Sequence, residues 1–500
     1  MGMSGAADPL WVGIDIGTQG VKAVAAASDG GVAGRGSAPL RSSRGDGRHE
    51  QDPEEWWAAA GRAAREAMAG AAGPRRVGAV AVCATSGTAL VADARLDPVG
   101  PALMYDDARA AGAAPALAAA VDDATWERVG SRPQPHWAFA RIAHLVRTVL
   151  RPGRGDLVLH QSDFVNGRLN GGPVAADTSH ALKSGADPLA AAWPGRVAAA
   201  LGAPPGALPE LVAPGTVIGS VCAAAAGHTG IPEGTPIVAG MTDGCAAQLA
   251  AGALEPGRWN SVLGTTLVLK GASEHRIADP AAGVYSHRSP DGRWWPGGAS
   301  SSGAGVLTAA FPGADLAAMD AAADLERPAS AVVYPLPGRG ERFPFTAPDA
   351  AGFTLGAPRD EADRYAATLQ GVAFLERLCL ERLAGLGAEV RGALRVTGGA
   401  VASPAWTRLR ADVLGRPLEV PESAEPAFGM AVLAAASDTP LSEAVARMVR
   451  VRSRVEPRPE VGERLLGSYR RLVRELAERG WTAGAGEPAA VRTANGRGVR

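Results

Sequence analysis

The chain has 500 residues, of which 46% are hydrophobic and 20% are charged, and its formal net charge is −1. This composition is typical of a globular protein with a large core, and the length predicts two or three domains. The charges are balanced and no basic stripe stands out, so nucleic acid and membrane surfaces are excluded as expected partners.

The cysteines indicate the compartment. Four of them stand far apart in the chain, with no C-x-x-C pair and no histidine at zinc-ligand spacing. This pattern predicts neither a structural metal site nor a disulfide framework, and it fits a reducing compartment. The first residues lack a basic region followed by an apolar run, and no segment reaches the roughly 18 apolar residues that a membrane span needs. We therefore expect a cytoplasmic protein.

The first elements form a predicted meander of three strands. Residues Leu10 to Ile16 alternate as a strand, Gly17-Thr18-Gln19-Gly20 is a tight turn, and strands Val21 to Ala27 and Val32 to Pro39 follow. Such short alternating runs with glycine turns are typical of antiparallel pairing.

The turn after the first strand is a candidate phosphate site. Its small residues let backbone N–H groups approach an anion, and Thr18 and Gln19 add side-chain donors. Asp15 places a carboxylate beside them, where Mg²⁺ could sit. A simple hairpin in which Asp15 caps the turn is the structural alternative.

A helix is predicted to begin at Asp52. This residue is the expected N-cap, Pro53 stands at the first helical position, and Glu55 completes a capping box. The helix should then continue to about Ala69.

A strand from Val77 to Cys83 ends in the hydroxyl-rich run Ala84-Thr85-Ser86-Gly87-Thr88. Hydroxyls at the carboxyl end of a strand suit a sugar or a phosphate, because α/β sheets bind ligands there. Ordinary turn chemistry explains the same residues equally well.

Further along, Met104 to Arg109 places two carboxylates and a guanidinium after another strand. A helix-capping aspartate with a local ion pair explains this run as well as substrate contact does. Helical segments are expected from Pro115 to Leu150. No role is assigned to any histidine.

The centre of the chain, Ile237 to Ala251, is an apolar strand that breaks at Gly240, presents Asp243 and continues as an alanine-rich helix. Asp243 is the candidate general base, since a carboxylate within reach of an alcohol can accept its proton late in a phosphoryl transfer. Its structural alternative is the N-cap of a helix from Cys245 to Ala253, and one residue can do both.

The second half begins with an echo of the first. Ser261 to Thr266 repeats the opening strand and its Gly-Thr turn, which predicts two similar domains facing each other across Asp243. The other elements expected in this half are a meander from Trp259 to Lys270, a strand with a Gly/Ser loop and a helix from Trp294 to Val306, a long irregular loop from Pro335 to Phe345, helices from Asp360 to Leu386, Pro404 to Leu414 and Glu460 to Arg479, and a strand at Leu394-Arg395-Val396 that ends in the turn Thr397 to Ala400.

Two common nucleotide sites are excluded by the motifs. No Gly-Lys pair occurs, so the G-x-x-x-x-G-K-[ST] loop is absent, and no G-x-G-x-x-G follows a strand. What remains is a split site in which two Gly-Thr turns hold phosphates while Asp15 and Asp243 face each other. Such a site suits phosphoryl transfer to an alcohol, which depends on alignment and charge stabilisation.

With these motifs in order, the chain resembles the FGGY carbohydrate kinases, whose two halves each have the ribonuclease-H-like, actin-type fold. The matches cover nearly the whole chain, and their order and spacing together are specific. They are GIDIGTQGVK, HEQDPEEWW, MYDDARA, GMTDGCAAQLAAGA, SVLGTT, GGASSSGAG, GERFPF and TGGAVASPAWTRLRADVLGRPLEVPESAEPAFGMAVLAAA.

The resemblance implies an α/β protein in which two such domains flank a catalytic cleft. Residues 8–250 would bind the sugar and end near the catalytic base, and residues 251–480 would bind ATP. The polar, Gly/Ala-rich residues 481–500 are expected to form a disordered tail. Homodimers are common in the family, and a homodimer is expected here by analogy.

The resemblance also assigns roles to residues. Asp243 matches the catalytic base, Asp15 matches the first-turn carboxylate near Mg²⁺ and the substrate, and both carboxylates with Ser86 would approach the sugar; Mg²⁺ would lie near Asp15 and Asp243. The expected ATP contacts are Thr18, Gln19, Gly264 and Thr265 at the phosphates, and Gly303, Gly305, Gly398, Gly399 and Ser403 on the nucleotide side. Ala400 stands where many members have a third glycine, so the backbone path beside adenosine should differ slightly.

Departures from the family pattern bear on the sugar. Xylulokinases usually carry Gln-Met-His-Gly where this chain has residues 84–87, and glycerol kinases follow their base with glutamine, whereas Gly244 follows it here. The runs ATSGT, MYDDAR, HQSDF, DTSHALKSGADP and GMTDG look most like the plant and cyanobacterial branch that resembles xylulokinases but phosphorylates D-ribulose.

We therefore expect an ATP-dependent pentulose kinase that converts D-ribulose to D-ribulose 5-phosphate. The alternatives within the fold are D-xylulose, L-ribulose or another polyol as acceptor. Those of another class are an actin- or Hsp70-like ATPase without a sugar acceptor and a catalytically silent sugar sensor.

Overall fold

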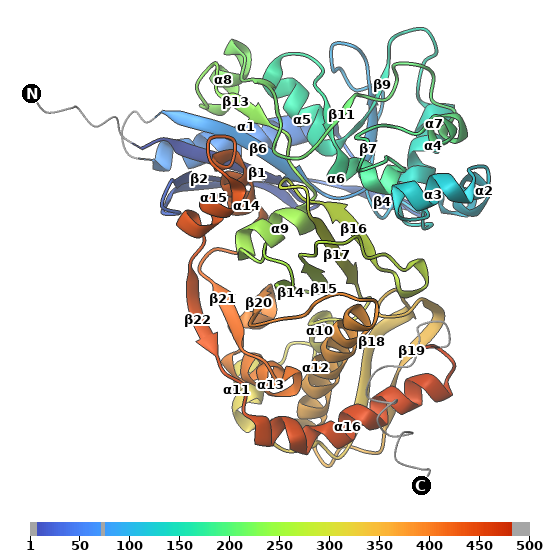
Figure 1. The fold of residues 1–500 in the computed structure, drawn as a ribbon, viewed down its shortest axis with the longest axis vertical. Helices are drawn as coiled ribbons and strands as arrows, with labels where there is room; N and C mark the ends of the chain where they lie inside the picture. The colour runs from blue at the N-terminus through green and yellow to red at the C-terminus, as the bar shows by residue number, and fades with distance from the viewer. Residues whose placement is uncertain (1–7, 72–75, 483–500) are drawn as a thin grey trace, which may run out of the picture. The chain divides into compact units, whose positions relative to one another are not determined.

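The computed structural model describes residues 8–71 and 76–482, which form two compact units (Figure 1). The first unit holds the described residues up to Gly252 together with His287–Arg293 and Ser423–Arg450, and the second holds Ala253–Ser286, Trp294–Glu422 and the described residues from Val451. A single boundary near residue 250 therefore misses two later segments that belong to the first unit. The tail expected over 481–500 lies outside the described residues from 483 onward.

The first unit is built on a six-stranded sheet with the order β12-β13-β6-β1-β2-β3. β1 pairs antiparallel with β2, β2 pairs antiparallel with β3, and β1, β6 and β13 run parallel. The expected meander is confirmed, and the arrangement agrees with the ribonuclease-H-like expectation. The strands are Leu10–Ile16 (β1), Gly20–Ala27 (β2), Val32–Pro39 (β3), Val77–Ala84 (β6), Val217–Ser220 (β12) and Pro236–Val238 (β13).

Helices cover both faces of this sheet, because successive side chains of a strand point to opposite sides. One face packs against α1, α5 and α8, and the other face of β1 and β6 is covered by α14 and α9. Gly13 lies on the second face, where a Cβ would overlap the backbone of Ala427 and Ala431 in α14. These helices are Pro53–Gly70 (α1), Gln161–Asn170 (α5), Ala223–Thr229 (α8), Asp243–Ala251 (α9) and Pro426–Ala435 (α14).

Helix α1 begins where the sequence predicts, with one contact different. The Asp52 side chain accepts the N–H of Glu54 at 2.9 Å, and Pro53 is the first helical residue. The expected capping box is wrong, because the Glu55 carboxylate pairs with Arg41, whose Nε donates to it at 3.0 Å.

The rest of the first unit is a sheet with the order β4-β5-β8-β7-β9, a two-stranded sheet and several short helices. The helical region expected from Pro115 to Leu150 becomes three helices. The elements are Ser43–Gly45 (β4), Arg48–Gln51 (β5), Ala89–Ala92 (β7), Ala102–Leu103 (β8), Leu157–His160 (β9), Ala176–Asp177 (β10), Leu211–Val212 (β11), Ala114–Ala119 (α2), Asp123–Val129 (α3), Ala138–Thr148 (α4), Thr178–Ala181 (α6), Gly195–Leu201 (α7) and Leu441–Met448 (α15).

The second unit contains a seven-stranded sheet with the order β16-β17-β15-β14-β20-β21-β22. β14 pairs antiparallel with β15 and parallel with β20, which repeats the pairing of β1 with β2 and β6. The expected duplication is therefore present in the sheets, and the two-domain α/β class is confirmed. The strands are Trp259–Leu263 (β14), Leu267–Gly271 (β15), Tyr285–Arg288 (β16), Trp294–Ala299 (β17), Leu394–Thr397 (β20), Leu418–Pro421 (β21) and Val451–Val455 (β22).

Helices pack this unit around α12, whose predicted apolar face is confirmed. Leu369, Val372, Leu375, Cys379 and Leu383 are all fully buried in its core. None of the helices in the described ranges is long and apolar enough to cross a membrane. The helices are Gly305–Ala310 (α10), Leu316–Ala322 (α11), Glu361–Gly385 (α12), Pro404–Leu414 (α13) and Pro459–Glu478 (α16).

One expectation for this unit is wrong. Residues 335–345 were predicted as an irregular loop, but most of them belong to β18 (Val332–Glu341), which pairs with β19 (Ala347–Leu355) as a two-stranded sheet. The register shifts twice between Tyr334 and Glu341. These irregularities accommodate prolines that a regular central strand would exclude.

Candidate functional site

Three parallel strands of the first unit end at one edge of its sheet. Ile16 of β1 pairs with Ala84 of β6, and Ala84 in turn bridges Thr242, which follows β13. Because the carboxyl ends of parallel strands form the usual ligand edge of an α/β sheet, residues just before or after these positions lie close together. Asp15, Ser86 and Asp243 are thereby brought to the same edge.

Asp15 lies on the sheet face that α14 and α9 cover. It sits opposite Cys83 of β6, whose Sγ donates a hydrogen bond to Asp15 Oδ1 at 3.5 Å. Burial and then the nearby Asp243 carboxylate raise the pKa of Asp15 to about 7, against smaller opposing effects of Cys83 and Lys22. A carboxyl with such a pKa, beside a second carboxylate, is typical of a functional site.

Asp243 is the first residue of α9, and the helix begins earlier than predicted. Thr242, with an extended backbone, occupies the N-cap position, so the expected N-cap role of Asp243 is wrong. Asp243 Oδ1 accepts the N–H of Gly244 at 2.7 Å, and the N–H of Thr242 donates to Ser179 Oγ at 3.2 Å. The first turn of a helix stabilises a negatively charged side chain. The hydrogen bonds of Thr242 and Gly244 hold the backbone on either side of Asp243, and they therefore fix the position from which its side chain extends.

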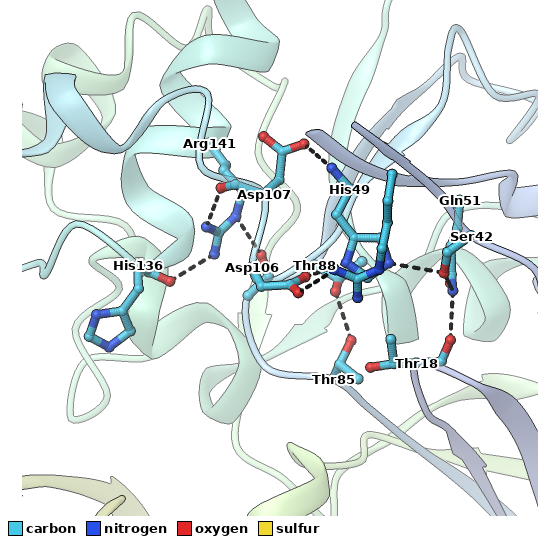
Figure 2. A network of polar contacts seen from close by, with 12 residues as sticks. Thr18, Ser42, His49, Gln51, Thr85, Thr88, Asp106, Asp107, His136 and Arg141 are labelled. Carbon is cyan, nitrogen blue, oxygen red and sulfur yellow. Dashed lines mark hydrogen bonds and ion pairs between the residues drawn. The ribbon is translucent and has the colours of Figure 1, made fainter. Parts of the chain in front are cut away.

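The hydroxyl cluster after β6 divides into partnered and unpartnered groups. Thr85 Oγ1 lies 2.7 Å from Thr88 Oγ1 and donates to Gln161 Oε1 at 2.8 Å, and Figure 2 shows the pair of threonines. Ser86 Oγ is buried, yet it has no hydrogen-bond partner among the described residues. A buried polar atom without a partner is costly, so this hydroxyl is available to a ligand.

The Gly17–Gly20 turn is fixed from the region that precedes α1. The N–H of Gly17 donates to Gly20 O at 3.0 Å, and Gln51 Nε2 donates to Thr18 O at 2.7 Å, as Figure 2 shows. Gln51 also donates to Ser42 Oγ at 2.9 Å. Gln19 is exposed. Gln51 therefore holds the backbone carbonyl of Thr18 in place, while Gln19 faces solvent.

The Met104 to Arg109 run contains structural carboxylates and one residue that sequence reasoning missed. Asp107 accepts the N–H of His49 at 2.8 Å and a bidentate contact from Arg109, and Asp106 pairs with His49 (Figure 2). Of the two explanations offered for this run, local ion pairs or substrate contact, the structure shows the ion pairs.

Tyr105 is the missed residue. Burial and then Asp106 raise the pKa of its phenol, to which Asp243 also contributes, and a hydrogen bond with Thr18 acts against the rise. Its side chain is 41% exposed. Its interactions with Thr18 and Asp243 place Tyr105 beside the Gly17–Gly20 turn and the strand edge that carries the carboxylates. The only signal in the sequence is an aromatic residue two positions after a strand, which is too common to single it out.

The second unit brings its own predicted residues together. Gly264 and Thr265 follow β14, and their carbonyls accept the N–H groups of Ala304 at 2.8 Å and Gly305 at 3.1 Å. A Cβ on Gly303 would lie 2.5 Å from the carbonyl carbon of Thr266, so only glycine fits there. This is a backbone-lined corner with small residues, as nucleotide sites require.

The turn after β20 reaches the same corner. Gly398 has a φ of +89°, and a Cβ there would lie 2.6 Å from Leu263 O, whereas Gly399 faces open space. Ser403 has a capping role instead, because its Oγ accepts the N–H of Trp406 at 2.9 Å at the start of α13. The Ser403 hydroxyl oxygen therefore takes part in the capping of α13, whereas the backbone of Gly399 is not covered by side chains.

The donor set suits a hydrated magnesium ion. Within the described residues, no group of three or more His, Cys, Asp or Glu side chains could hold a metal ion. Mg²⁺ usually keeps several waters and binds one or two carboxylates together with substrate phosphates. Asp15 and Asp243, two neighbouring carboxylates with mutual repulsion, fit that requirement.

Comparison with known proteins agrees with this geometry. The family models for the N-terminal and C-terminal domains of the FGGY family of carbohydrate kinases match residues 10–250 and 259–437. A xylulose kinase of Streptomyces coelicolor is 32% identical, covering 87% of this chain and 89% of the relative, and one of Streptomyces rubiginosus is 30% identical with the same coverage. The crystal structure of a xylulose kinase from Rhodospirillum rubrum has a TM-score of 0.83 at 26% identity, covering 94% of this chain and 98% of that one. The chain belongs to the FGGY family of carbohydrate kinases.

Proposed function

We propose that the chain transfers the γ-phosphoryl group of ATP to the terminal hydroxyl of a pentulose, and that D-ribulose is the preferred acceptor. The observation that supports this most is the strand edge of the first unit, where two carboxylates and the unpartnered Ser86 hydroxyl meet. Such a set of acceptors and one hydroxyl suits a polyhydroxy substrate.

Asp243 is the proposed general base. A carboxylate is too weak to remove an alcohol proton beforehand, but it accepts the proton late, as the new O–P bond forms. Its backbone is held by the start of α9 and by the contact of Thr242 with Ser179. A fixed starting point for the side chain is what an aligned proton acceptor requires.

Asp15 is proposed to orient the sugar and, with Asp243, to hold Mg²⁺ directly or through waters. When bound, Mg²⁺ neutralises phosphate charge and aligns the transferred group. Because the pKa of Asp15 is raised to about 7, Asp15 takes up a proton near neutral pH unless a cation or a substrate hydroxyl stabilises its ionised form.

The ATP contacts are proposed in both units. Thr18 and Gln19 in the first unit, with Gly264 and Thr265 in the second, would contact the phosphates through turn amides and side chains. The glycine-rich corner formed by Gly303, Gly305, Gly398 and Gly399 would accept the nucleotide, because it exposes backbone and has little side-chain bulk. Ser403 would shape this corner as the cap of α13.

The second candidate acceptor is D-xylulose, and the curated relatives named xylulose kinase favour it. The two sugars differ only in the configuration of one hydroxyl-bearing carbon. A site that leaves a buried polar group unpaired with the wrong epimer discriminates strongly. Ser86, where xylulokinases usually have histidine, supports D-ribulose.

The test is ADP release by the purified protein with Mg-ATP and each of D-ribulose, D-xylulose, L-ribulose, L-xylulose, ribitol and glycerol, beside a sample without sugar. A kcat/KM for D-ribulose at least about tenfold above the others would support the proposal. Preference for D-xylulose would keep the pentulose kinase and reject the D-ribulose assignment. Turnover equal to the sugar-free sample throughout would reject both and favour an ATPase or a sensor.

A further inference from the structure

The loop between β17 and α10 is anchored by one buried carboxylate. Glu341, the last residue of β18, is 2% exposed, and both of its oxygens accept hydrogen bonds from this loop. The N–H of Ser301 donates to Oε1 at 2.6 Å, and Ser300 Oγ donates to Oε2 at 3.0 Å. The hydroxyl of Ser302, the next residue, donates to the carbonyl of Pro335 in the same strand. The loop is therefore fastened to β18 at three successive residues.

This loop leads directly into the glycine-rich corner. Gly303 comes next in the chain, and a Cβ there would lie 2.5 Å from the carbonyl carbon of Thr266. The N–H of Ala304 then donates to Gly264 O at 2.8 Å. Closely packed segments transmit a displacement to their neighbours, because they have no free space in which to absorb it. A shift of the loop would therefore move the backbone of the corner.

We propose that Glu341 is a positioning residue, which holds the glycine-rich corner in the shape that binds the nucleotide. The inference rests on the assignment of that corner to ATP under the proposed function. Glu341 acts through Ser300 and Ser301 rather than by contact with ATP. A carboxylate suits this position, because its two oxygens accept several N–H and O–H donors at once and leave none of them buried without a partner.

The two oxygens of Glu341 have partners of different kinds. Oε1 accepts the backbone N–H groups of Ser301 and of Arg342, the latter at 2.9 Å, and an N–H group can only donate. Oε2 accepts the hydroxyls of Ser300 and of Tyr334, the latter at 2.9 Å, and a hydroxyl can also accept. An amide side chain with its oxygen at the Oε1 position and its NH₂ group at the Oε2 position therefore keeps these four contacts.

Two substitutions test the requirement for an acceptor. Glu341→Gln should bind ADP within about threefold of the wild type, since its amide reproduces the four contacts. Glu341→Met has a similar volume but no strong acceptor, so the N–H of Ser301 loses its partner and the Kd for ADP should rise about tenfold or more. In Glu341→Met the KM for ATP should rise by a similar factor, whereas the KM for the sugar should stay within about twofold.

The experiment is calorimetric titration of ADP into the full-length wild type and the two variants, with urea unfolding of each protein alongside. Weaker ADP binding by Glu341→Met together with recovery in Glu341→Gln supports the proposal. Equal affinity in all three proteins, or an equal loss in both variants, overturns it. If Glu341→Met does not fold, Ser300→Ala takes its place, because it removes the side-chain contact of the loop with the carboxylate. An unchanged Kd for ADP in that variant would overturn the proposal.

The matched control is Asp363→Ala. Asp363 is also a buried carboxylate of the second unit that accepts backbone N–H groups, from Ser330 at 3.2 Å and from Arg359 at 2.9 Å. The control should lower the unfolding free energy and leave the Kd for ADP unchanged, and a loss of ADP affinity as large as that of Glu341→Met would overturn the proposal.

The same measurements separate this inference from the proposed function. A wild type that binds ADP but shows no sugar-dependent ADP release would reject the proposed function alone, since the titrations still decide the role of Glu341. Sugar-dependent ADP release with equal ADP affinity in the wild type and Glu341→Met would reject the Glu341 inference alone.

Discussion

The two units each hold a pair of neighbouring ionisable side chains, and the pairs are opposite in kind. In the second unit, Arg410 donates two hydrogen bonds of 2.7 Å to Glu376, and Ser261 Oγ donates to the same carboxylate at 2.6 Å, with both charged side chains fully buried. In the first unit, Asp15 and Asp243 carry like charges at a strand edge, and the pKa of Asp15 is raised.

The difference separates a structural ion pair from the two carboxylates that are proposed to act on the substrate. The Glu376–Arg410 pair joins opposite charges and ties β14, α12 and α13 together, so removing one partner leaves a buried charge uncompensated. Ionisation of Asp15 costs folding free energy, because burial and the like charge of Asp243 both disfavour its charged form. A protein keeps such an arrangement where binding or catalysis requires it.

The largest effect on the contrast between the two pairs is expected from replacing Asp243, the proposed general base. Asp243→Asn should lower kcat by about 10³-fold or more, because general base catalysis and Mg²⁺ binding are both affected, while the unfolding free energy is retained or increased. The measurement is sugar-dependent ADP release together with urea unfolding. Asp123→Asn is the matched control, because Asp123 is also the first residue of a helix in this unit but is exposed. Equal turnover by the two variants would contradict the assignment.

Removing a partner from the structural pair should instead affect stability. Glu376→Gln leaves Arg410 buried without its countercharge and should lower the unfolding free energy by about 3–4 kcal/mol. Glu361→Gln on the same helix α12 is the control, because its contact with Arg364 is exposed and worth less than about 0.5 kcal/mol. Chemical unfolding of both variants tests the contrast, and similar losses would show that burial of the pair is not what matters.

Asp15→Asn should raise the unfolding free energy, in contrast to Glu376→Gln, which should lower it. The folded protein binds the Asp15 proton more tightly than the unfolded chain, so the wild type loses stability as pH rises through about 4 to 7. The stability difference should therefore change in favour of the variant by up to about 4 kcal/mol between pH 4 and pH 8, since the pKa of Asp15 is raised from 3.8 to about 7 and one pKa unit corresponds to about 1.4 kcal/mol. A difference independent of pH would refute the role of ionisation.

The smallest expected effect concerns the hydroxyl cluster. Ser86→Ala should raise the KM for the sugar by about fivefold to tenfold and leave stability unchanged, because Ser86 Oγ has no partner among the described residues. Thr85→Val is its counterpart and should lower stability by about 1 kcal/mol, since Thr85 bonds both Thr88 and Gln161. Sugar titrations and unfolding curves of the two variants should therefore show reversed patterns.

Much of the fold could be predicted because its signals are local. The opening meander, the long apolar face of α12 and the start of α13 at Pro404 all follow from patterns within one element. The expected loop around Pro335 was wrong because β18 depends on a partner strand that proline-rich sequence does not suggest.

The site was predictable to a similar degree. The strand-edge rule and the family motifs identify Asp15, Ser86 and Asp243, and the structure brings these together. The roles assigned to them remain predictions. The contacts of Cys83 and Tyr105 could not be predicted, because they depend on which residues face them across strands and loops, and one sequence carries no such pairing.

The return of residues 423–450 to the first unit has a consequence for synthesis. When a ribosome has produced the chain as far as Gly252, the sheet exists in full but the face with Gly13, Asp15 and Cys83 still lacks α14. Domains generally fold as they emerge, yet α14 begins only at Pro426, roughly 170 residues beyond Gly252, and can dock only after it has been made. A nascent chain that ends before these residues therefore exposes an apolar sheet face beside Asp15, and this strand edge acquires its final surroundings only after residues 423–450 have been made.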